Sequence, residues 1–148
     1  MEKRSPWRRV VYGESSNGIQ RAREAAEMIL GLRTAIYPAP DLAAAKRWYS
    51  DVLGVAPYFD QPFYVGFSVG GFELGLVPDA SPGTGGPQPL WGVDSIESVY
   101  ARLLALGASP LDPITEVGGD IKVAAVADPF GNRFGIVENP HFQASAVR

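Results

Sequence analysis

The feature that most constrains the fold is a helix-like segment that occurs twice with the same spacing. Asp41 and Gly54 bracket DLAAAKRWYSDVLG, and Asp94 and Gly107 bracket DSIESVYARLLALG at the same length. Each segment follows a short apolar run and precedes a stretch rich in strand-forming residues. Two copies are too few for a solenoid, which needs about three repeats to bury a core. The spacing therefore predicts one domain built from two related halves.

Turn and cap signals predict the order β-α-β-β-β in each half. Asp41 suits a helix N-cap, because its carboxylate can accept hydrogen bonds from first-turn N–H groups, and Gly54 can end the helix in the left-handed conformation. Asp94 or Ser95 is expected to begin the second helix. Trp48 and Tyr49 are expected in the core. Strands are expected at residues 33–37, 55–59, 64–69 and 72–77, and at 88–93, 109–117, 120–127 and 134–138.

The chain of 148 residues has the length of about one domain. Residues 1–31 are expected to form a polar arm and a helix from Ile19 to about Leu30. The domain is expected at 32–142, with module one at 32–77, a Gly/Pro-rich linker at 78–87 and module two at 88–142, followed by a tail at 143–148.

Composition argues against several classes of protein. A net charge of −3 disfavours a nucleic-acid-binding domain. The sequence has no apolar run long enough for a membrane span and no pattern of a signal peptide. Cysteine is absent, which suits a cytoplasmic location. The single histidine and the lack of cysteine leave no residues for a nucleophile–base triad, so no catalytic residue is assigned.

Three segments together resemble the vicinal oxygen chelate superfamily, the group of glyoxalases, bleomycin-resistance proteins and ring-cleaving dioxygenases. They are PDLAAAKRWYSDVLGV, VDSIESVYARLLALGA and ADPFGNRFGIVENPHF. The resemblance implies an α+β fold in which two βαβββ modules pair into an open, cup-shaped mixed sheet, with helices on the convex faces. It also implies a ligand or metal inside the cup and a homodimer, in some members with exchanged modules.

The resemblance also marks four positions at which metal-using members hold a divalent ion with His and Glu side chains. The first falls on Thr34 and its counterpart on Pro87 or Gln88. The position in the last strand of module two falls on Gly135, and matching FELGLV with RFGIVE places Glu73 opposite it. Since a divalent ion needs several converging ligands, Glu73 alone does not suffice. No metal or other cofactor is therefore expected, and a divalent metal is kept as the alternative.

Strand alternation and the aromatic content suggest which side chains face the cup. Glu73 is either a polar rim residue paired with Arg133 or part of a charged pair that binds a ligand. The expected ligand-binding residues are Thr34, Ile36, Phe59, Phe67, Glu73, Trp91, Phe130 and Arg133.

These observations favour a metal-free protein that binds a small organic molecule in the concave cavity. One alternative is a metal-dependent lyase, isomerase or dioxygenase with a degenerate site. Another is a partner-binding module that uses the N-terminal arm. A homodimer is expected, and neither a nucleic acid nor a membrane is expected as a partner.

Overall fold

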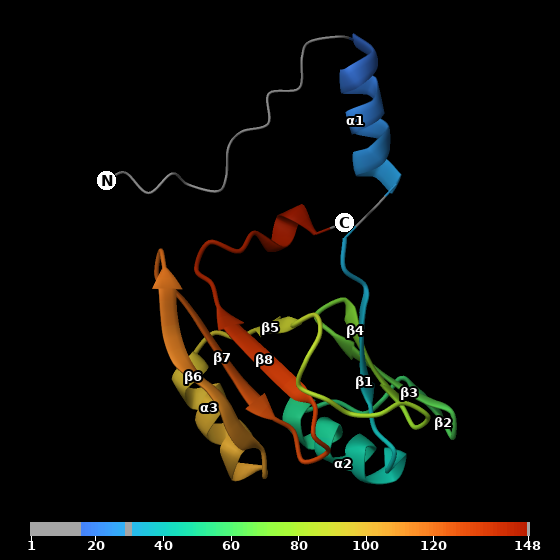
Figure 1. Cartoon of the computed structure of the whole chain (residues 1–148), viewed down its shortest axis with the longest axis vertical. Coiled ribbons are helices and arrows are strands. Elements are labelled where there is room, and N and C mark those ends of the chain that lie inside the picture. Colours follow the sequence, from blue (N-terminus) through green and yellow to red (C-terminus); the bar gives the residue numbers. More distant parts are fainter. Residues whose placement is uncertain (1–15, 29–30, 148) are drawn as a thin grey trace. The chain divides into compact units, whose positions relative to one another are not determined.

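The computed structural model describes residues 16–28 and 31–147 (Figure 1). The chain divides into two compact units, of which one consists of residues 32–144 and the other contains α1 (Ser16–Met28). The helix expected from Ile19 to Leu30 thus begins three residues earlier, and its expected end lies outside the described residues, as do positions 1–15 of the arm. No described helix has the length and apolar character needed to cross a membrane.

Module one is a four-stranded mixed sheet with one helix. Its elements are β1 (Thr34–Pro38), α2 (Leu42–Leu53), β2 (Phe59–Gln61), β3 (Tyr64–Val69) and β4 (Phe72–Val77). The strand order is β1-β4-β3-β2, with β1 parallel to β4 and the other pairs antiparallel. The expected strand at 55–59 is wrong in its bounds: β2 starts later, because Pro57 cannot donate to a strand ladder.

Module two repeats the same topology. Its elements are β5 (Leu90–Gly92), α3 (Ile96–Ala105), β6 (Ser109–Gly118), β7 (Ile121–Ala127) and β8 (Arg133–Glu138). The strand order is β5-β8-β7-β6, and β5 is parallel to β8. A short 3₁₀ helix, η1 (Ala144–Ala146), follows. The α+β fold with two βαβββ modules is confirmed, and no strand ladder among the described residues joins the two sheets.

The caps of α2 are those that the sequence predicts. The Asp41 carboxylate accepts a hydrogen bond from the backbone N–H of Ala44 at 3.0 Å, and Gly54 takes the left-handed conformation with φ 68°. Helix α3 is capped differently. Ser95 occupies the N-cap position but makes no side-chain cap bond. The backbone N–H of Ile96 instead donates to the Glu138 carboxylate at 3.1 Å. A residue of β8 therefore caps the helix of its own module.

The helices cover one face of each sheet, α2 on β3 and β4, and α3 on β6, β7 and β8 (Figure 1). The strand side chains on these faces form one core with the helices, and Trp48 and Tyr49 are buried in it as predicted. The Arg102 guanidinium on α3 donates to the carbonyl oxygens of Asp51 and Val52 at the end of α2, at 2.5 and 2.9 Å. Within residues 32–144, no helix covers the opposite faces of the sheets.

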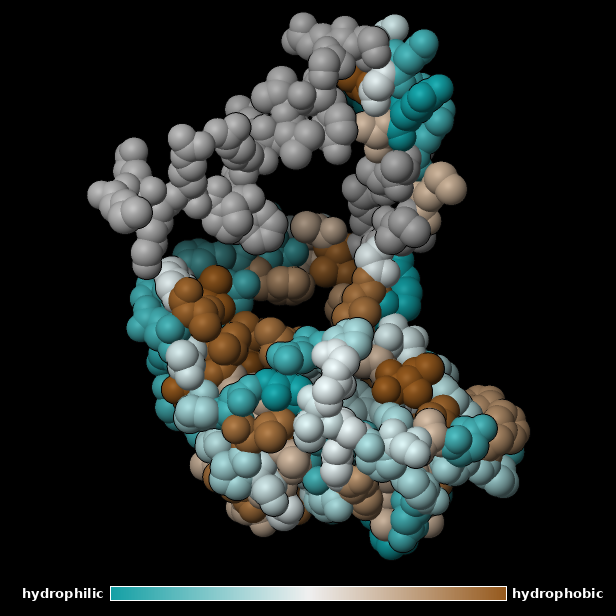
Figure 2. Space-filling view, in the orientation of Figure 1, coloured by the Kyte–Doolittle hydropathy of each residue, from teal (hydrophilic) through white to brown (hydrophobic). Residues whose placement is uncertain are grey.

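Large apolar side chains reach the surface, among them Ile36 and Leu90, at 57% and 46% exposure. On the face seen in Figure 2, hydrophobic residues lie among polar ones over both sheets. Side chains of β1 and β5 that point away from the core therefore supply apolar surface next to the polar groups described below.

Candidate functional site

A carboxylate that accepts hydrogen bonds from three hydroxyl groups lies on the face of the module-one sheet opposite α2. Glu73 on β4 accepts hydrogen bonds from Thr34 Oγ1 at 3.3 Å and from the Tyr64 hydroxyl through Oε1, and from the Tyr58 hydroxyl through Oε2. Thr34 and Glu73 are direct neighbours in the parallel β1–β4 pair, so their side chains point to the same face. The contact between Thr34 and Glu73 is therefore a consequence of strand register.

Two glycines make room for this network. A Cβ at Gly66 would lie 3.0 Å from Glu73 Oε2 and 3.2 Å from the Tyr58 ring, and a Cβ at Gly75 would overlap the Tyr64 hydroxyl. The side chains of Tyr58, Tyr64 and Glu73 thus lie close over the sheet surface. Burial raises the pKa of Tyr64, so this phenol stays a hydrogen-bond donor at neutral pH.

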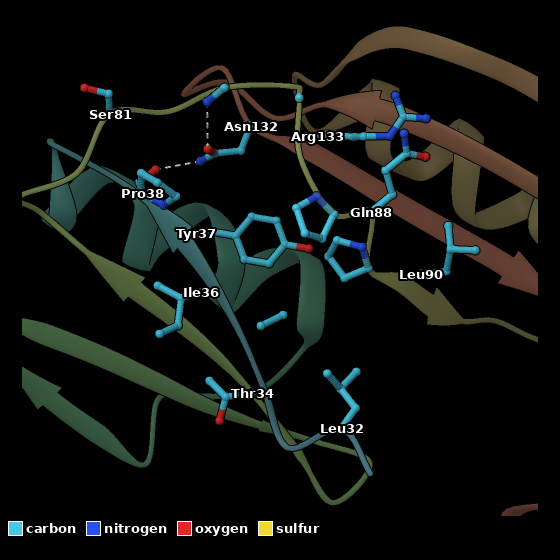
Figure 3. Close-up of a pocket in the computed structure, with 15 residues that line it drawn as sticks. Leu32, Thr34, Ile36, Tyr37, Pro38, Ser81, Gln88, Leu90, Asn132 and Arg133 are labelled. Atoms are coloured by element: carbon cyan, nitrogen blue, oxygen red, sulfur yellow. Dashed lines mark hydrogen bonds between the residues drawn. The ribbon is translucent and has the colours of Figure 1, made fainter. Parts of the chain in front are cut away.

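A cavity of about 740 Å³ lies between β1 and the segment that leads into β5. That volume is within the range usual for small-molecule sites, roughly 300–1,000 Å³. In Figure 3 the residues of β1 occupy one side of the cavity, and Gln88, Leu90 and Arg133 the other. Its lining residues are Leu32, Thr34, Ala35, Ile36, Tyr37, Pro38, Ser81, Gly83, Gly85, Pro87, Gln88, Pro89, Leu90, Asn132 and Arg133.

Asn132 fixes the two walls of the cavity to each other. Its Nδ2 donates to the carbonyl oxygen of Pro38 at 2.6 Å, and its Oδ1 accepts from the backbone N–H of Gly83 at 3.4 Å (Figure 3). The Asn132 side chain is almost fully buried. The linker and β1 are therefore connected through a residue of the turn before β8.

Arg133 is the charged residue of the cavity wall. Its Nη2 forms an ion pair with Asp112 on β6, and its side chain is only 17% exposed. Its Nε is buried and has no hydrogen-bond partner among the described residues. Because a buried donor without a partner is costly, this nitrogen can gain from an acceptor brought by a ligand. The sequence left open whether Arg133 pairs with Glu73. In the structure Arg133 pairs with Asp112 instead.

The structure brings together part of the expected set of ligand-binding residues. Thr34, Ile36 and Arg133 line the cavity, and Glu73 joins it through its bond with Thr34. Phe59 lies opposite Gly66 in the β2–β3 pair, on the face of the Glu73 network. Its ring contacts those of Phe63 and Tyr64 at centroid distances of 6.1 and 6.0 Å.

The other three expected residues lie elsewhere, which corrects their predicted orientation. Phe67 is fully buried against α2, because it pairs with Leu74 on the core face of the sheet. Trp91 also points to the core, where it stacks on Phe134 and donates Nε1 to the Tyr37 hydroxyl at 3.0 Å.

Phe130, in the turn before β8, packs its ring edge-on against Trp48 of α2 at a centroid distance of 6.3 Å. In a strand, an error of one residue moves a side chain to the other face, which explains Phe67 and Trp91. Strand alternation does not apply to Phe130, since it belongs to a turn.

Two residues of the network were not in the expected set, Tyr58 and Tyr64. A signal for Tyr64 is its position two residues before Gly66, which places both on one face of β3. Tyr58 precedes β2, where strand alternation does not set the direction of a side chain, so the sequence holds no comparable signal for it.

Strand pairing also corrects the equivalence of the two modules. Ile36 pairs with Gly75 in module one and Leu90 with Gly135 in module two, so Gly75 is the counterpart of Gly135. By the same register, Glu73 is the counterpart of Arg133 and not of Gly135. The expected match of Glu73 with Gly135 was wrong by two residues. A shift of two residues along a strand leaves a side chain on the same face of the sheet but at a different position.

The four positions that the resemblance assigns to metal ligands are then Thr34, Gln88, Gly75 and Gly135, and this donor set does not fit a divalent ion. Nor can an acid be placed at Gly135 without a shift, because a Cβ there would lie 2.8 Å from the carbonyl oxygen of Pro89. Nowhere in the described part of the chain do three or more His, Cys, Asp or Glu side chains gather as a metal site would require.

Comparison with known proteins gives a consistent picture. Residues 31–136 match the family model of the Glyoxalase/Bleomycin resistance protein/Dioxygenase superfamily. A glyoxalase-related enzyme from Fulvimarina pelagi is 25% identical and superposes with a TM-score of 0.63, over 76% of this chain and 90% of that one.

A lactoylglutathione lyase from Agrobacterium tumefaciens is 23% identical, with a TM-score of 0.62 over 76% of this chain and 98% of that one. A glyoxalase/bleomycin resistance protein/dioxygenase family enzyme from Burkholderia phytofirmans is 18% identical, with a TM-score of 0.61 over 71% and 95% of the two chains. Comparison with curated proteins gave no match. The family model covers most of the sequence and the solved structures share both modules, so the chain belongs to the glyoxalase/bleomycin resistance protein/dioxygenase superfamily.

Proposed function

We propose that this chain is a binding protein that holds a small organic molecule in the cavity beside β1, without a divalent metal. The observation that carries the proposal is Arg133 at the wall of a cavity of suitable volume, because its buried Nε has no hydrogen-bond partner within the described part of the chain. An acceptor group on the ligand, such as a carboxylate, would supply that partner.

The rest of the wall favours a ligand with an apolar part. Leu32, Ile36 and Leu90 are exposed apolar side chains of this wall, and each Å² of apolar surface removed from water contributes roughly 25 cal/mol. Gln88 adds an amide group that can donate and accept hydrogen bonds. A small aromatic carboxylate combines these properties.

The proposal is tested with benzoate as the probe and benzyl alcohol as its neutral counterpart, by calorimetry or NMR titration of the full chain. Benzoate is expected to bind more tightly, and excess EDTA is expected to leave its affinity unchanged. Arg133→Gln should weaken benzoate about tenfold, which corresponds to about 1.4 kcal/mol.

Arg47→Gln is the matched control, because Arg47 is exposed on α2 and lies outside the cavity lining while carrying the same charge. Equal loss of benzoate affinity in both variants, or loss of binding on addition of EDTA, would overturn the proposal.

The metal-dependent lyase, isomerase or dioxygenase remains an alternative that metal analysis can decide. A stoichiometric divalent ion in protein purified without chelator would support it. The homodimer and the cytoplasmic location stay predictions. The proposed role of the N-terminal arm as a partner-binding segment concerns mostly residues outside the described part, and deletion of residues 1–30 tests it.

A further inference from the structure

We infer that the face of the module-one sheet that carries Glu73 binds an organic cation, either an amine or a quaternary ammonium group. This deepens the proposed function, on which it rests in one respect: the cation is taken to be part of the small molecule that the chain holds. Thr34 connects the two regions, because it lines the cavity and donates its hydroxyl to Glu73.

The first argument is the charge of Glu73. Its three side-chain partners, Thr34, Tyr58 and Tyr64, are neutral hydroxyl donors. None of the ion pairs between described residues includes Glu73, whereas Asp60, Asp112 and Glu138 each have a basic partner. A half-buried carboxylate that has only neutral donors and no basic partner among the described residues attracts a cation.

The second argument is the free hydrogen-bonding capacity of the carboxylate. An ionised carboxylate has two oxygens with about four acceptor directions, and the three hydroxyls occupy three of them. One direction therefore remains for an N–H group of a ligand amine. A quaternary ammonium group needs no hydrogen bond and would use the charge alone.

The third argument is the group of aromatic rings next to the carboxylate. Tyr58, Phe59 and Phe63 are 64%, 39% and 66% exposed, and Phe59 contacts both Phe63 and Tyr64. Aromatic rings attract ammonium groups through their negative faces, most strongly where several rings and a carboxylate surround the cation. Tyr58 and Tyr64 contact the carboxylate directly, and Phe59 and Phe63 extend the aromatic surface from Tyr64. Such a surface beside a carboxylate without an ion-pair partner among the described residues suits an organic cation.

The same residues disfavour other ligands. The charge of Glu73 repels an anion, and a divalent ion would find one carboxylate and three hydroxyls, a poor donor set. A neutral aromatic compound could use the rings, and the experiment is arranged to distinguish that outcome.

The test compares choline with 3,3-dimethylbutan-1-ol, which has nearly the same shape but no charge. Both are titrated into the full chain, with NMR resonances of β2, β3 and β4 as the readout. Choline is expected to bind about tenfold more tightly or better, and added salt should reduce the difference.

Two variants of acidic residues locate the effect. Glu73→Gln keeps the size of the side chain and should remove the preference for choline. Asp60→Asn is the matched control, because it removes one negative charge from β2, where Asp60 pairs with Lys46. Its preference for choline should remain.

Tyr58 separates the role of the ring from that of the hydroxyl. It is largely exposed, so its replacement should not disturb the fold. Tyr58→Leu should weaken choline more than Tyr58→Phe, because only the first change removes the ring.

The outcomes for the two proposals are separate. Equal affinity for choline and its neutral counterpart, or the same loss in Glu73→Gln and Asp60→Asn, would overturn the organic-cation site and leave benzoate binding at Arg133 unaffected. Binding of choline without binding of benzoate would support the cation site and reject the cavity proposal.

Discussion

At the scale of single residues, the candidate site depends on glycines, which have no side chain, as well as on the polar and aromatic side chains around them. Glycine weakens a strand unless another group approaches the backbone closely. Gly66 and Gly75 are such cases, because the space above them holds Glu73 with Tyr58 and the Tyr64 hydroxyl, respectively. Each glycine therefore lets a large side chain lie flat on the sheet, which a sequence reading does not show by itself.

Gly75→Ala tests this interpretation. The new Cβ would overlap the Tyr64 hydroxyl, so the phenol should move and lose its hydrogen bond to Glu73, at a cost of about 1 kcal/mol in the free energy of unfolding. Urea denaturation measures the cost, and Tyr64 side-chain resonances report the movement. Gly92→Ala in β5 is the control, because no described atom apart from those of its chain neighbours lies within 4 Å of its added Cβ. Equal effects of the two changes would contradict the explanation.

At the scale of elements, the turn before β8 holds the two modules together. The nearly buried Asp128 accepts hydrogen bonds from the backbone N–H groups of Phe130 and Asn132 at 3.0 and 2.8 Å. Its other oxygen accepts from the Tyr49 hydroxyl of α2 at 2.6 Å. The DPFGN segment, predicted as a turn, thus also binds a helix of the other module.

Asp128→Ala should therefore destabilise the protein strongly. It would leave the Tyr49 hydroxyl and two backbone N–H groups without partners, and each buried unsatisfied group costs about 1–3 kcal/mol. We expect a loss of about 3 kcal/mol or more in the free energy of unfolding by chemical denaturation. Asp94→Ala, at an exposed position before α3, should change it by less than about 0.5 kcal/mol. A small loss at Asp128 would mean that the turn does not connect the modules.

Elements were more predictable from the sequence than the directions of side chains. The cap residues Asp41 and Gly54 and the strands at 64–69 and 72–77 agree with the structure, because local signals set them. Phe67 and Trp91 were placed on the wrong face, since a periodicity of two leaves the phase undetermined in short strands rich in apolar residues on both faces. The Tyr58 contact with Glu73 depends on a loop and on Gly66, which no local pattern reveals.

At the scale of the whole molecule, the repeat supplies two equivalent positions that now carry opposite charges. Glu73 and Arg133 occupy equivalent positions in the last strand of each module, as the pairs Ile36–Gly75 and Leu90–Gly135 show. One is held by hydroxyls and the other by Asp112. The duplicated framework thus places an acidic and a basic side chain at equivalent positions, and a ligand that used both sites would need unlike groups at its two ends.

The shared core also predicts how the protein responds to high pH. Burial, the largest cause, raises the pKa of Tyr37 to about 12, and burial together with the Asp128 charge raises the pKa of Tyr49 well above its usual value of 10.0. Above pH 10 the unfolded chain loses these protons, whereas the folded chain keeps that of Tyr37 until about pH 12. Unfolding then releases protons, so the free energy of unfolding should fall with rising pH in this window. Below pH 10 both states keep these protons, so these groups give the free energy of unfolding no pH dependence there.

Tyr37→Phe tests the sign and the size of this effect. Each such tyrosine can contribute a slope of up to about 1.4 kcal/mol per pH unit, so the variant should lose stability less steeply between pH 10 and pH 12. The variant should be less stable at neutral pH, because the Trp91 Nε1–H loses its acceptor, and for that reason the slope is the measure and not the absolute value. Urea denaturation at several pH values gives both curves, and parallel curves would show that Tyr37 titrates alike in the folded and unfolded chain.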